Sequence, residues 1–222
     1  MSASQPAGRT QAERSRETRE KIIQGTLRCL QQHGYAGTTV SRVLAESGVS
    51  RGAYLHHYPS KADLFRDAAE QLMRAAYRRL GKATQSTSGE RETLARMFRA
   101  AWQDVFKQPE ADIFIELAVA SRSDDTLARI FHPLAMAYVT TLRQSAGHYF
   151  EGQGTQDPAD LVMLTQWLFR GMAMDLPLAD QPDYFDRFIS LWIEMMSSQL
   201  KLRNELPEKP PRPAWPGDQG QS

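Results

Sequence analysis

The stretch "GVSRGAYLHHYPSKADLF", residues 48–65, decides the fold, because it combines a turn, a short helix and a helix stop. Gly48 suits a tight turn, since glycine adopts positive φ at little cost. Ser50 can cap a helix over residues 51–57. Pro59 ends that helix, because the residue before a proline is driven away from helical backbone angles.

Helices are also predicted on both sides of this stretch. Apolar residues at helical spacing predict a helix over about 16–33, ended by Gly34, and a second over about 40–46. Downstream, "SKAD" (60–63) is similar to a capping box and opens a longer helix to about residue 80. A helix, a four-residue turn and a second helix predict a helix-turn-helix motif.

The second helix of such a motif lies in the major groove of DNA, with its N-terminal residues toward the bases. Arg51 could pair with a guanine through two hydrogen bonds, and Gly52 and Ala53 are small enough to let the backbone approach. Other polar and aromatic residues suit contacts with phosphate. The residues expected at DNA are Thr39, Ser41, Arg42, Ser50, Arg51, Gly52, Ala53, Tyr54, His56, His57, Tyr58 and Lys61.

The adjacent histidines raise the alternative of a metal site. Neighbouring residues on a helix diverge by about 100°, so His56 and His57 cannot readily share one ion. Cys29 is the single cysteine of the chain, which excludes an internal disulfide and a cysteine-clustered zinc site. We therefore expect no metal, and no cofactor motif is present either.

The segment "GTTVSRVLAESGVSRGAYLHHYPSKADLF", residues 37–65, resembles the signature of the tetracycline-repressor (TetR) family of bacterial transcription regulators. The matching positions are Gly37, Thr38, Thr39, Val40, Ala45, Gly48, Val49, Ser50, Arg51, Gly52, Ala53, His57, Tyr58, Lys61, Leu64 and Phe65. The resemblance covers under a quarter of the chain. It implies a homodimeric, ligand-responsive regulator with an all-helical fold.

One departure from the family pattern concerns α-helical residues 54 and 55. Family members usually carry Leu-Tyr where this chain has Tyr54-Leu55, and the tyrosine of that pair normally touches phosphate. Either Tyr54 makes this contact from a neighbouring direction or the contact is lost. We expect Leu55 to turn into the core. Ser41-Arg42 also departs from the pattern, and Arg42 adds a charge that could face DNA.

Composition is that of a globular protein, with 41% hydrophobic and 24% charged residues and a net charge of +1. The charge is uneven: residues 1–61 hold nine basic and four acidic residues, whereas the remainder is mildly acidic. A basic head suggests a polyanionic partner. No apolar run could span a membrane and the N-terminus lacks a signal peptide, so a bacterial cytoplasmic location is expected.

The rest of the sequence also predicts helices, so the fold class is all-α: an N-terminal helix-turn-helix domain of three helices and a larger C-terminal domain for ligand binding and dimerisation. We place helices near 90–107, 110–122, 125–151, 158–176 and 182–204. The expected domains are 16–62 and 63–205, and the polar loop 81–89 is the best internal boundary. Residues 1–15 and the proline-rich tail 206–222 are expected to be disordered.

The last two predicted helices are apolar on more than one face, which indicates burial on several sides and hence a partner subunit. The residues expected at the dimer interface are Leu161, Leu164, Leu168, Met172, Phe185, Phe188, Ile189, Trp192 and Met196.

A small-molecule pocket in the larger domain is implied by the resemblance. Methionine and aromatic residues would suit a largely apolar effector, although plain core packing is the commoner role of such residues. The residues expected in the pocket are Trp102, Phe106, Phe114, Phe131, His132, Met136, Met163, Trp167, Arg170 and Met174.

These patterns together predict a regulator, most often a repressor in this family, that binds a (pseudo)palindromic operator with recognition helices about 34 Å apart. The main alternative is a helical sensor or carrier of small molecules that does not bind DNA. An all-helical enzyme is a third, weaker hypothesis, because no catalytic motif is present.

Overall fold

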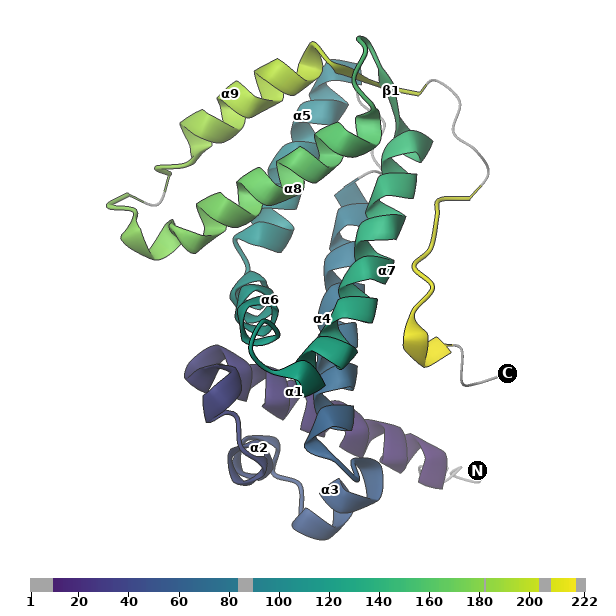
Figure 1. Cartoon of the computed structure of the whole chain (residues 1–222), viewed down its shortest axis with the longest axis vertical. Coiled ribbons are helices and arrows are strands. Elements are labelled where there is room, and N and C mark those ends of the chain that lie inside the picture. The colour runs from purple at the N-terminus through teal and green to yellow at the C-terminus, as the bar shows by residue number, and fades with distance from the viewer. Residues whose placement is uncertain (1–9, 84–89, 182, 204–208, 219–222) are drawn as a thin grey trace, which may run out of the picture. The chain divides into compact units, whose positions relative to one another are not determined.

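The computed structural model describes residues 10–83, 90–181, 183–203 and 209–218, which are mostly helical (Figure 1), as predicted. The chain divides into two units, Met1–Ala68 and Ala69–Ser222. The division falls within helix α4 (Lys61–Ala83), six residues after the predicted boundary at residue 62. Most of the predicted loop 81–89 lies outside the described residues. Among the described helices, none has the length and apolar character needed to cross a membrane.

Helix α1 (Gln11–Gly37) begins earlier than the sequence predicted. Thr10 and Glu13 form a capping box: the Thr10 hydroxyl accepts from the Glu13 backbone N–H, and the Glu13 carboxylate accepts from the Thr10 N–H. The expectation of disorder is therefore wrong for residues 11–15, and residues 1–9 lie outside the described part. Gly34 interrupts the helix with a φ of 65°, as a glycine stop would, but a final turn follows it.

Helices α2 (Val40–Ser47) and α3 (Arg51–His57) form the predicted helix-turn-helix. Thr39 caps α2 by accepting from the Arg42 N–H, and Ser50 caps α3 by accepting from the Ala53 N–H. The turn between them depends on Gly48, whose φ of 66° lies in the left-handed region.

The core of the first unit joins α1, α2, α3 and the start of α4. It is built from Ile22, Ile23, Cys29, Val43, Tyr54, Tyr58, Leu64 and Ala68. Helices α1 and α2 approach closely at Gly25, where an added Cβ would lie 2.9 Å from the Ser47 Cβ. Arg28 of α1 also donates to the backbone oxygen of Glu46, at 2.7 Å, and so fastens the end of α2.

The second unit contains the remainder of α4 and the helices that follow it. These are α5 (Glu90–Ala101), the π-helical turn η1 (Trp102–Phe106), α6 (Pro109–Ala120), α7 (Asp125–Tyr149), α8 (Pro158–Met174), the 3₁₀ turn η2 (Leu176–Leu178) and α9 (Asp186–Ser197). Their core centres on Phe169, whose ring centroid lies 5.7 Å from that of Trp102 and 5.6 Å from that of Phe106. Such edge-on aromatic contacts add to the burial of apolar area.

Two short strands form a feature that the sequence did not predict. β1 (Phe150–Gly152) pairs antiparallel with β2 (Leu200–Leu202), so the predicted helices at 125–151 and 182–204 both end before their expected limits. Glu151 forms ion pairs with Lys201 and Arg203 across this pairing, at 3.1 and 3.2 Å. Three residues are too few to show an alternating pattern, and this is why the strands escaped prediction.

The proline-rich tail also differs from its predicted disorder over residues 209–218, which return to α4 (Figure 1) and end in the turn η3 (Pro216–Asp218). The Trp215 side chain is buried, and Arg74 of α4 stacks on its ring and forms an ion pair with Asp218. Tyr77 of α4 donates a hydrogen bond to the Pro211 carbonyl. Prolines do not prevent this packing, because an extended chain with few conformations loses little entropy when it docks.

Two glycines of the helix-turn-helix make a matched pair for substitution. Nothing lies within 4 Å of a Cβ added at either Gly48 or Gly52, but only Gly48 has a positive φ. We expect Gly48→Ala to lower the free energy of unfolding of this unit by about 1–2 kcal/mol, through backbone strain alone. Gly52→Ala should raise it by up to about 1 kcal/mol, because alanine favours helix.

Amide hydrogen exchange over residues 22–68 in the full chain measures both effects. Equal destabilisation by the two substitutions would contradict the assignment of the turn.

Candidate functional site

Helix α3 presents one face to solvent. Arg51, Gly52, Leu55 and His56 are exposed, and they follow the spacing of a single helical face. The opposite face carries Tyr54 and the residue after the helix, Tyr58, which pack in the core of the unit.

The burial of the tyrosines corrects two predictions. Both tyrosines were expected to contact phosphate. Tyr54 and Tyr58 are each only 2% exposed, so neither ring offers its hydroxyl at the surface. Leu55 is 51% exposed and does not turn into the core. The physical reason is rotation of the helix: the large rings at positions i and i+4 bury more apolar area than Leu55 could, and they take the inner face.

Gly52 has no packing role within the described chain. The space around an added Cβ is empty to 4 Å, and its φ is not in the left-handed region. A glycine in a helix costs about 1 kcal/mol relative to alanine. Its absence of side chain therefore leaves a smooth, open surface beside Arg51, which permits the close approach of another molecule.

The remaining predicted contact residues divide by their roles. The hydroxyls of Thr39 and Ser50 already accept hydrogen bonds as helix caps, although both residues are exposed. Arg42 is exposed and donates to the Gly37 carbonyl at 2.5 Å, so its guanidinium is held at the start of α2. Ser41 is exposed and Ala53 is half-buried.

Lys61 and His57 lie at the other end of α3. The ammonium of Lys61 is exposed and stands over the rings of Tyr35 and Phe65, at 5.4 and 5.0 Å from their centroids. His57 is half-buried. Burial lowers its pKa, with smaller contributions from His56 and Arg19, and so disfavours its cationic form.

A network of hydrogen bonds centred on Arg19 holds α3 in place. The sequence did not predict it. Arg19 of α1 donates to an Asp67 carboxylate oxygen of α4 at 2.5 Å and to the Tyr58 hydroxyl at 3.3 Å. These two hydrogen bonds raise the pKa of Arg19, and burial raises that of Tyr58. Partners 39 and 48 positions apart leave no local sequence signal.

The described residues offer no metal centre, since no three or more His, Cys, Asp or Glu side chains gather in them closely enough to hold an ion. The rings of His56 and His57 meet edge to face with centroids 5.3 Å apart. This geometry is a ring contact between neighbours and not a pair of converging ligands.

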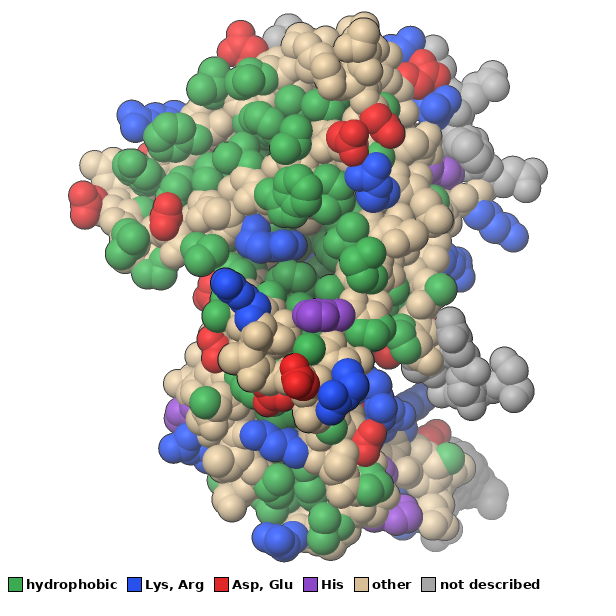
Figure 2. Space-filling model, in the orientation of Figure 1, with side chains coloured by type: hydrophobic (Ala, Val, Ile, Leu, Met, Phe, Trp, Pro, Cys, Tyr) green, Lys and Arg blue, Asp and Glu red, His purple; other side chains and the backbone are tan. Residues whose placement is uncertain are grey.

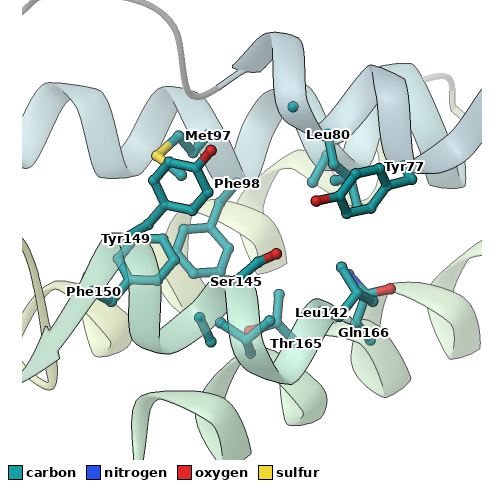
Figure 3. Close-up of a pocket in the computed structure, with 14 residues that line it drawn as sticks. Tyr77, Leu80, Met97, Phe98, Leu142, Ser145, Tyr149, Phe150, Thr165 and Gln166 are labelled. Atoms are coloured by element: carbon teal, nitrogen blue, oxygen red, sulfur yellow. The ribbon is translucent and has the colours of Figure 1, made fainter. Parts of the chain in front are cut away.

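A pocket of about 110 Å³ lies within the second unit, among α4, α5, α7 and α8 (Figure 3). Phe98, Tyr149 and Phe150 place their rings at one end, and the hydroxyls of Tyr77 and Ser145 point into the space. The pocket is lined by Tyr77, Leu80, Gly81, Met97, Phe98, Ala101, Leu142, Ser145, Ala146, Tyr149, Phe150, Val162, Thr165 and Gln166.

None of the ten residues predicted for a pocket lines this one. Trp102, Phe131 and Met163 are buried in the core, whereas Met136, Trp167 and Met174 are exposed. His132 is also exposed, and its Nε2 lies 3.3 Å from the Ser121 hydroxyl. Most of the predicted aromatic and methionine residues therefore lie in the core or at the surface.

Three of the predicted residues, Phe106, Phe114 and Arg170, line a smaller cavity of about 40 Å³. The Arg170 guanidinium stands 4.6 Å from the centroid of the Phe114 ring, and burial lowers its pKa. Burial also raises the pKa of the nearby Tyr138 to about 12. Gln166 lines both cavities.

Helices α8 and α9 carry an exposed apolar face, visible as the gathering of hydrophobic side chains over them in Figure 2. Of the predicted interface residues, Leu161, Phe185, Ile189 and Met196 are buried in the unit's own core, and Met172 and Trp192 are half-buried. The exposed face contains the other three predicted residues, Leu164, Leu168 and Phe188. It also contains Trp167, Tyr184, Leu191 and Met195, which were not predicted.

Comparison with known proteins finds similarity in the first unit. Residues 22–68 match the family described as "Bacterial regulatory proteins, tetR family". The chain is 34% identical to the HTH-type transcriptional regulator CymR of Pseudomonas putida over 122 residues, which are 55% of this chain and 60% of that protein. It is 46% identical over 48 residues to the HTH-type transcriptional repressor AcnR of Corynebacterium glutamicum, covering 22% of this chain and 26% of the repressor. The chain therefore spans less than two thirds of the length of these relatives.

The fold as a whole is similar to a solved structure of a TetR transcriptional regulator from Chloroflexus aurantiacus, with a TM-score of 0.69 at 17% identity. The similarity covers 86% of this chain and 99% of that one. Each of these three proteins is described as a regulator of transcription and none as an enzyme. The similarity to the Chloroflexus aurantiacus structure, at 17% identity, is one of fold.

The Arg19–Asp67 contact can be tested with a double-mutant cycle of Arg19→Met and Asp67→Asn. We expect a coupling of about 1 kcal/mol, because Arg19 is half exposed but also holds the buried Tyr58 hydroxyl. Hydrogen exchange in α3 of the full chain measures it. Strictly additive effects would show that the ion pair does not hold α3.

Proposed function

Through residues 22–68 the chain belongs to the tetR family of bacterial regulatory proteins, and we propose that it is a transcriptional regulator, acting in the cytoplasm as a repressor on a palindromic operator. The proposal rests on the exposed face of α3, where Arg51 stands beside the unobstructed backbone of Gly52. A guanidinium next to a bare stretch of helix suits insertion into the major groove and pairing with guanine.

Contacts with the phosphate backbone come from other exposed groups of the same unit. Arg42 and Lys61 supply cations, and the helix starts at Thr39 and Ser50 supply backbone N–H groups. Leu55 and His56 complete the face, with Leu55 offering only apolar contact. Affinity should therefore depend strongly on salt concentration, while sequence preference depends chiefly on Arg51.

The second unit would supply dimerisation. The apolar face of α8 and α9 includes Leu164, Trp167 and Leu191, each about half exposed. An apolar face of this kind on a regulator of palindromic DNA fits a second copy of the chain, in a four-helix contact. The two copies of α3 would then reach successive major grooves about 34 Å apart.

The pocket among α4, α5, α7 and α8 would hold a small-molecule effector. Helix α4 begins in the first unit at Lys61 and supplies Tyr77 and Leu80 to the pocket. A ligand that favours one position of α4 would change the population of the DNA-binding state, with a coupling of typically ~1–3 kcal/mol.

The deciding experiment is selection of genomic DNA fragments by the purified full chain, followed by sequencing of the retained fragments. Enrichment of a palindrome is the expected result. No enrichment at low salt would favour a small-molecule sensor without DNA binding, unless the protein already holds its inducer. Mass spectrometry of a small-molecule extract separates these outcomes.

Substitutions on α3 should separate sequence discrimination from general affinity. We expect Arg51→Ala to cost about 1–3 kcal/mol of discrimination between operator and random DNA. Lys61→Ala should weaken both about equally and reduce the salt slope by about one unit. Fluorescence anisotropy at several salt concentrations gives both quantities. Wild-type affinity and salt slope in both variants would refute this docking.

A charge placed on the α8–α9 face should break the dimer. We expect Leu164→Glu to raise the dimer dissociation constant roughly 30-fold or more, because it would bury a carboxylate without a partner at a hot spot worth ~2 kcal/mol. Val119→Glu, on the exposed surface of α6, is the control that should leave the dimer intact. Sedimentation velocity measures both, and a wild-type chain that stays monomeric at micromolar concentration would eliminate the interface.

A further inference from the structure

The pocket of Figure 3 has a lining that selects against charge. None of the fourteen described residues around it is acidic, basic or a histidine, and most are aliphatic or aromatic. An ionised group buried there would lose its hydration without gaining a counter-ion, which is strongly unfavourable. The occupant of this pocket is therefore neutral.

Most polar groups around the pocket are already engaged. The Tyr77 hydroxyl donates to the Pro211 carbonyl, and the Thr165 hydroxyl donates to the Leu161 carbonyl and accepts from the Trp192 indole N–H. These groups are fixed by the protein's own contacts. They shape the wall of the pocket but have little capacity left for a ligand.

Two buried polar atoms at the pocket differ from these. Ser145 Oγ of α7 and Gln166 Oε1 of α8 have no hydrogen-bond partner anywhere in the described part of the chain. Gln166 is 5% exposed, and the Ser145 hydroxyl points into the space. A buried acceptor without a donor destabilises the empty protein, so such atoms are usually satisfied by a ligand or a water.

The two atoms differ in what they require. The Gln166 carbonyl oxygen can only accept a hydrogen bond, whereas the Ser145 hydroxyl can also donate one. A hydroxyl group on a ligand suits either atom, because it can donate to Gln166 and can accept from Ser145. A methyl group in the same place satisfies neither.

The size and shape of the pocket restrict the rest of the ligand. Its volume of about 110 Å³ is of the order of the ~150 Å³ apolar cavity that holds a benzene molecule. The rings of Phe98, Tyr149 and Phe150 gather at one end, where they offer edges and faces to an aromatic partner. One ring with a single small substituent fills this space.

We propose that this pocket takes a neutral single-ring molecule that carries a hydroxyl group, held by Gln166 and Ser145. The proposal rests on the proposed function, since it names the chemical class of the effector of that regulator. Arg170 lines the smaller cavity that shares Gln166 with this pocket, and its guanidinium could attract a ligand carboxylate. The test therefore includes a carboxylate probe.

The probes are phenol, toluene and benzoate, titrated into the purified full chain by calorimetry. They share one ring and differ in a hydroxyl, a methyl or a carboxylate. We expect the phenol to bind about tenfold more tightly than either of the others, a ratio typical of a neutral hydrogen-bonded contact. Equal binding of phenol and toluene, tightest binding of the benzoate, or no binding of the phenol would overturn the proposal.

The substitution Gln166→Leu should change two quantities in opposite directions: the thermal stability of the free protein and its preference for the phenol. Without ligand it should raise the midpoint of thermal unfolding, because it removes a buried acceptor that lacks a donor. With ligand it should reduce the preference for phenol over toluene to about threefold or less. A lower midpoint together with an unchanged preference would show that Gln166 serves only the core.

Two further variants control this result. Gln103→Leu makes the same exchange at an exposed site of η1 outside the pocket and should keep the wild-type preference. Ser145→Ala should also reduce the preference and provides an independent test if Gln166→Leu does not fold.

The selected genomic DNA distinguishes failure of this proposal from failure of the proposed function. A chain that retains a palindrome but does not prefer the phenol is a regulator with another class of effector. A chain that prefers the phenol but retains no DNA has the predicted pocket and is not a regulator.

Discussion

The position of α3 depends on the burial of two tyrosine rings. A helix of seven residues, Arg51–His57, has too few internal hydrogen bonds to be stable alone, so its tertiary contacts decide whether and how it forms. Tyr54 and Tyr58 anchor one side in the core, and Arg19 with Asp67 holds the Tyr58 hydroxyl. Every other property of the helix follows from this rotation, including the exposure of Arg51, Gly52 and Leu55.

Local signals made the helix-turn-helix predictable. Thr39, Gly48 and Ser50 each act within three or four residues of their own position, so their roles as caps and turn were accessible from sequence. The rotation of α3 was not, because it depends on whether Tyr54 or Leu55 buries more area against residues far away in the chain. The prediction for Leu55 failed at that point.

The same limit applied to the second unit. The apolar character of α8 and α9 correctly indicated burial on more than one side, but Leu161 and Leu164 looked equivalent in sequence although one is buried and the other is half exposed. The pocket was missed for a related reason. Its distinctive members are Ser145 and Gln166, ordinary residues whose significance arises only because no neighbour satisfies them.

The unsatisfied polar atoms of the pocket also explain why stability and ligand recognition can oppose each other in the second unit. The described structure is complete in its apolar core around Phe169, with rings packed edge to face. At Ser145 and Gln166, however, buried polar atoms lack hydrogen-bond partners among the described residues. Replacing either residue with an apolar one would increase the stability of the unit. Retention of such atoms is a property expected of a binding site and not of a core.

The docked tail has a consequence for how the chain is made. Asp218 meets Arg74 across 144 positions of sequence, and Trp215 lies against the same arginine. Synthesis proceeds from the N-terminus, so α4 emerges from the ribosome long before the segment that covers it. Throughout translation of the intervening helices, this face of α4 stays bare. The aromatic ring of Tyr77 on this face is then open to chaperones and to misassembly with neighbouring nascent chains.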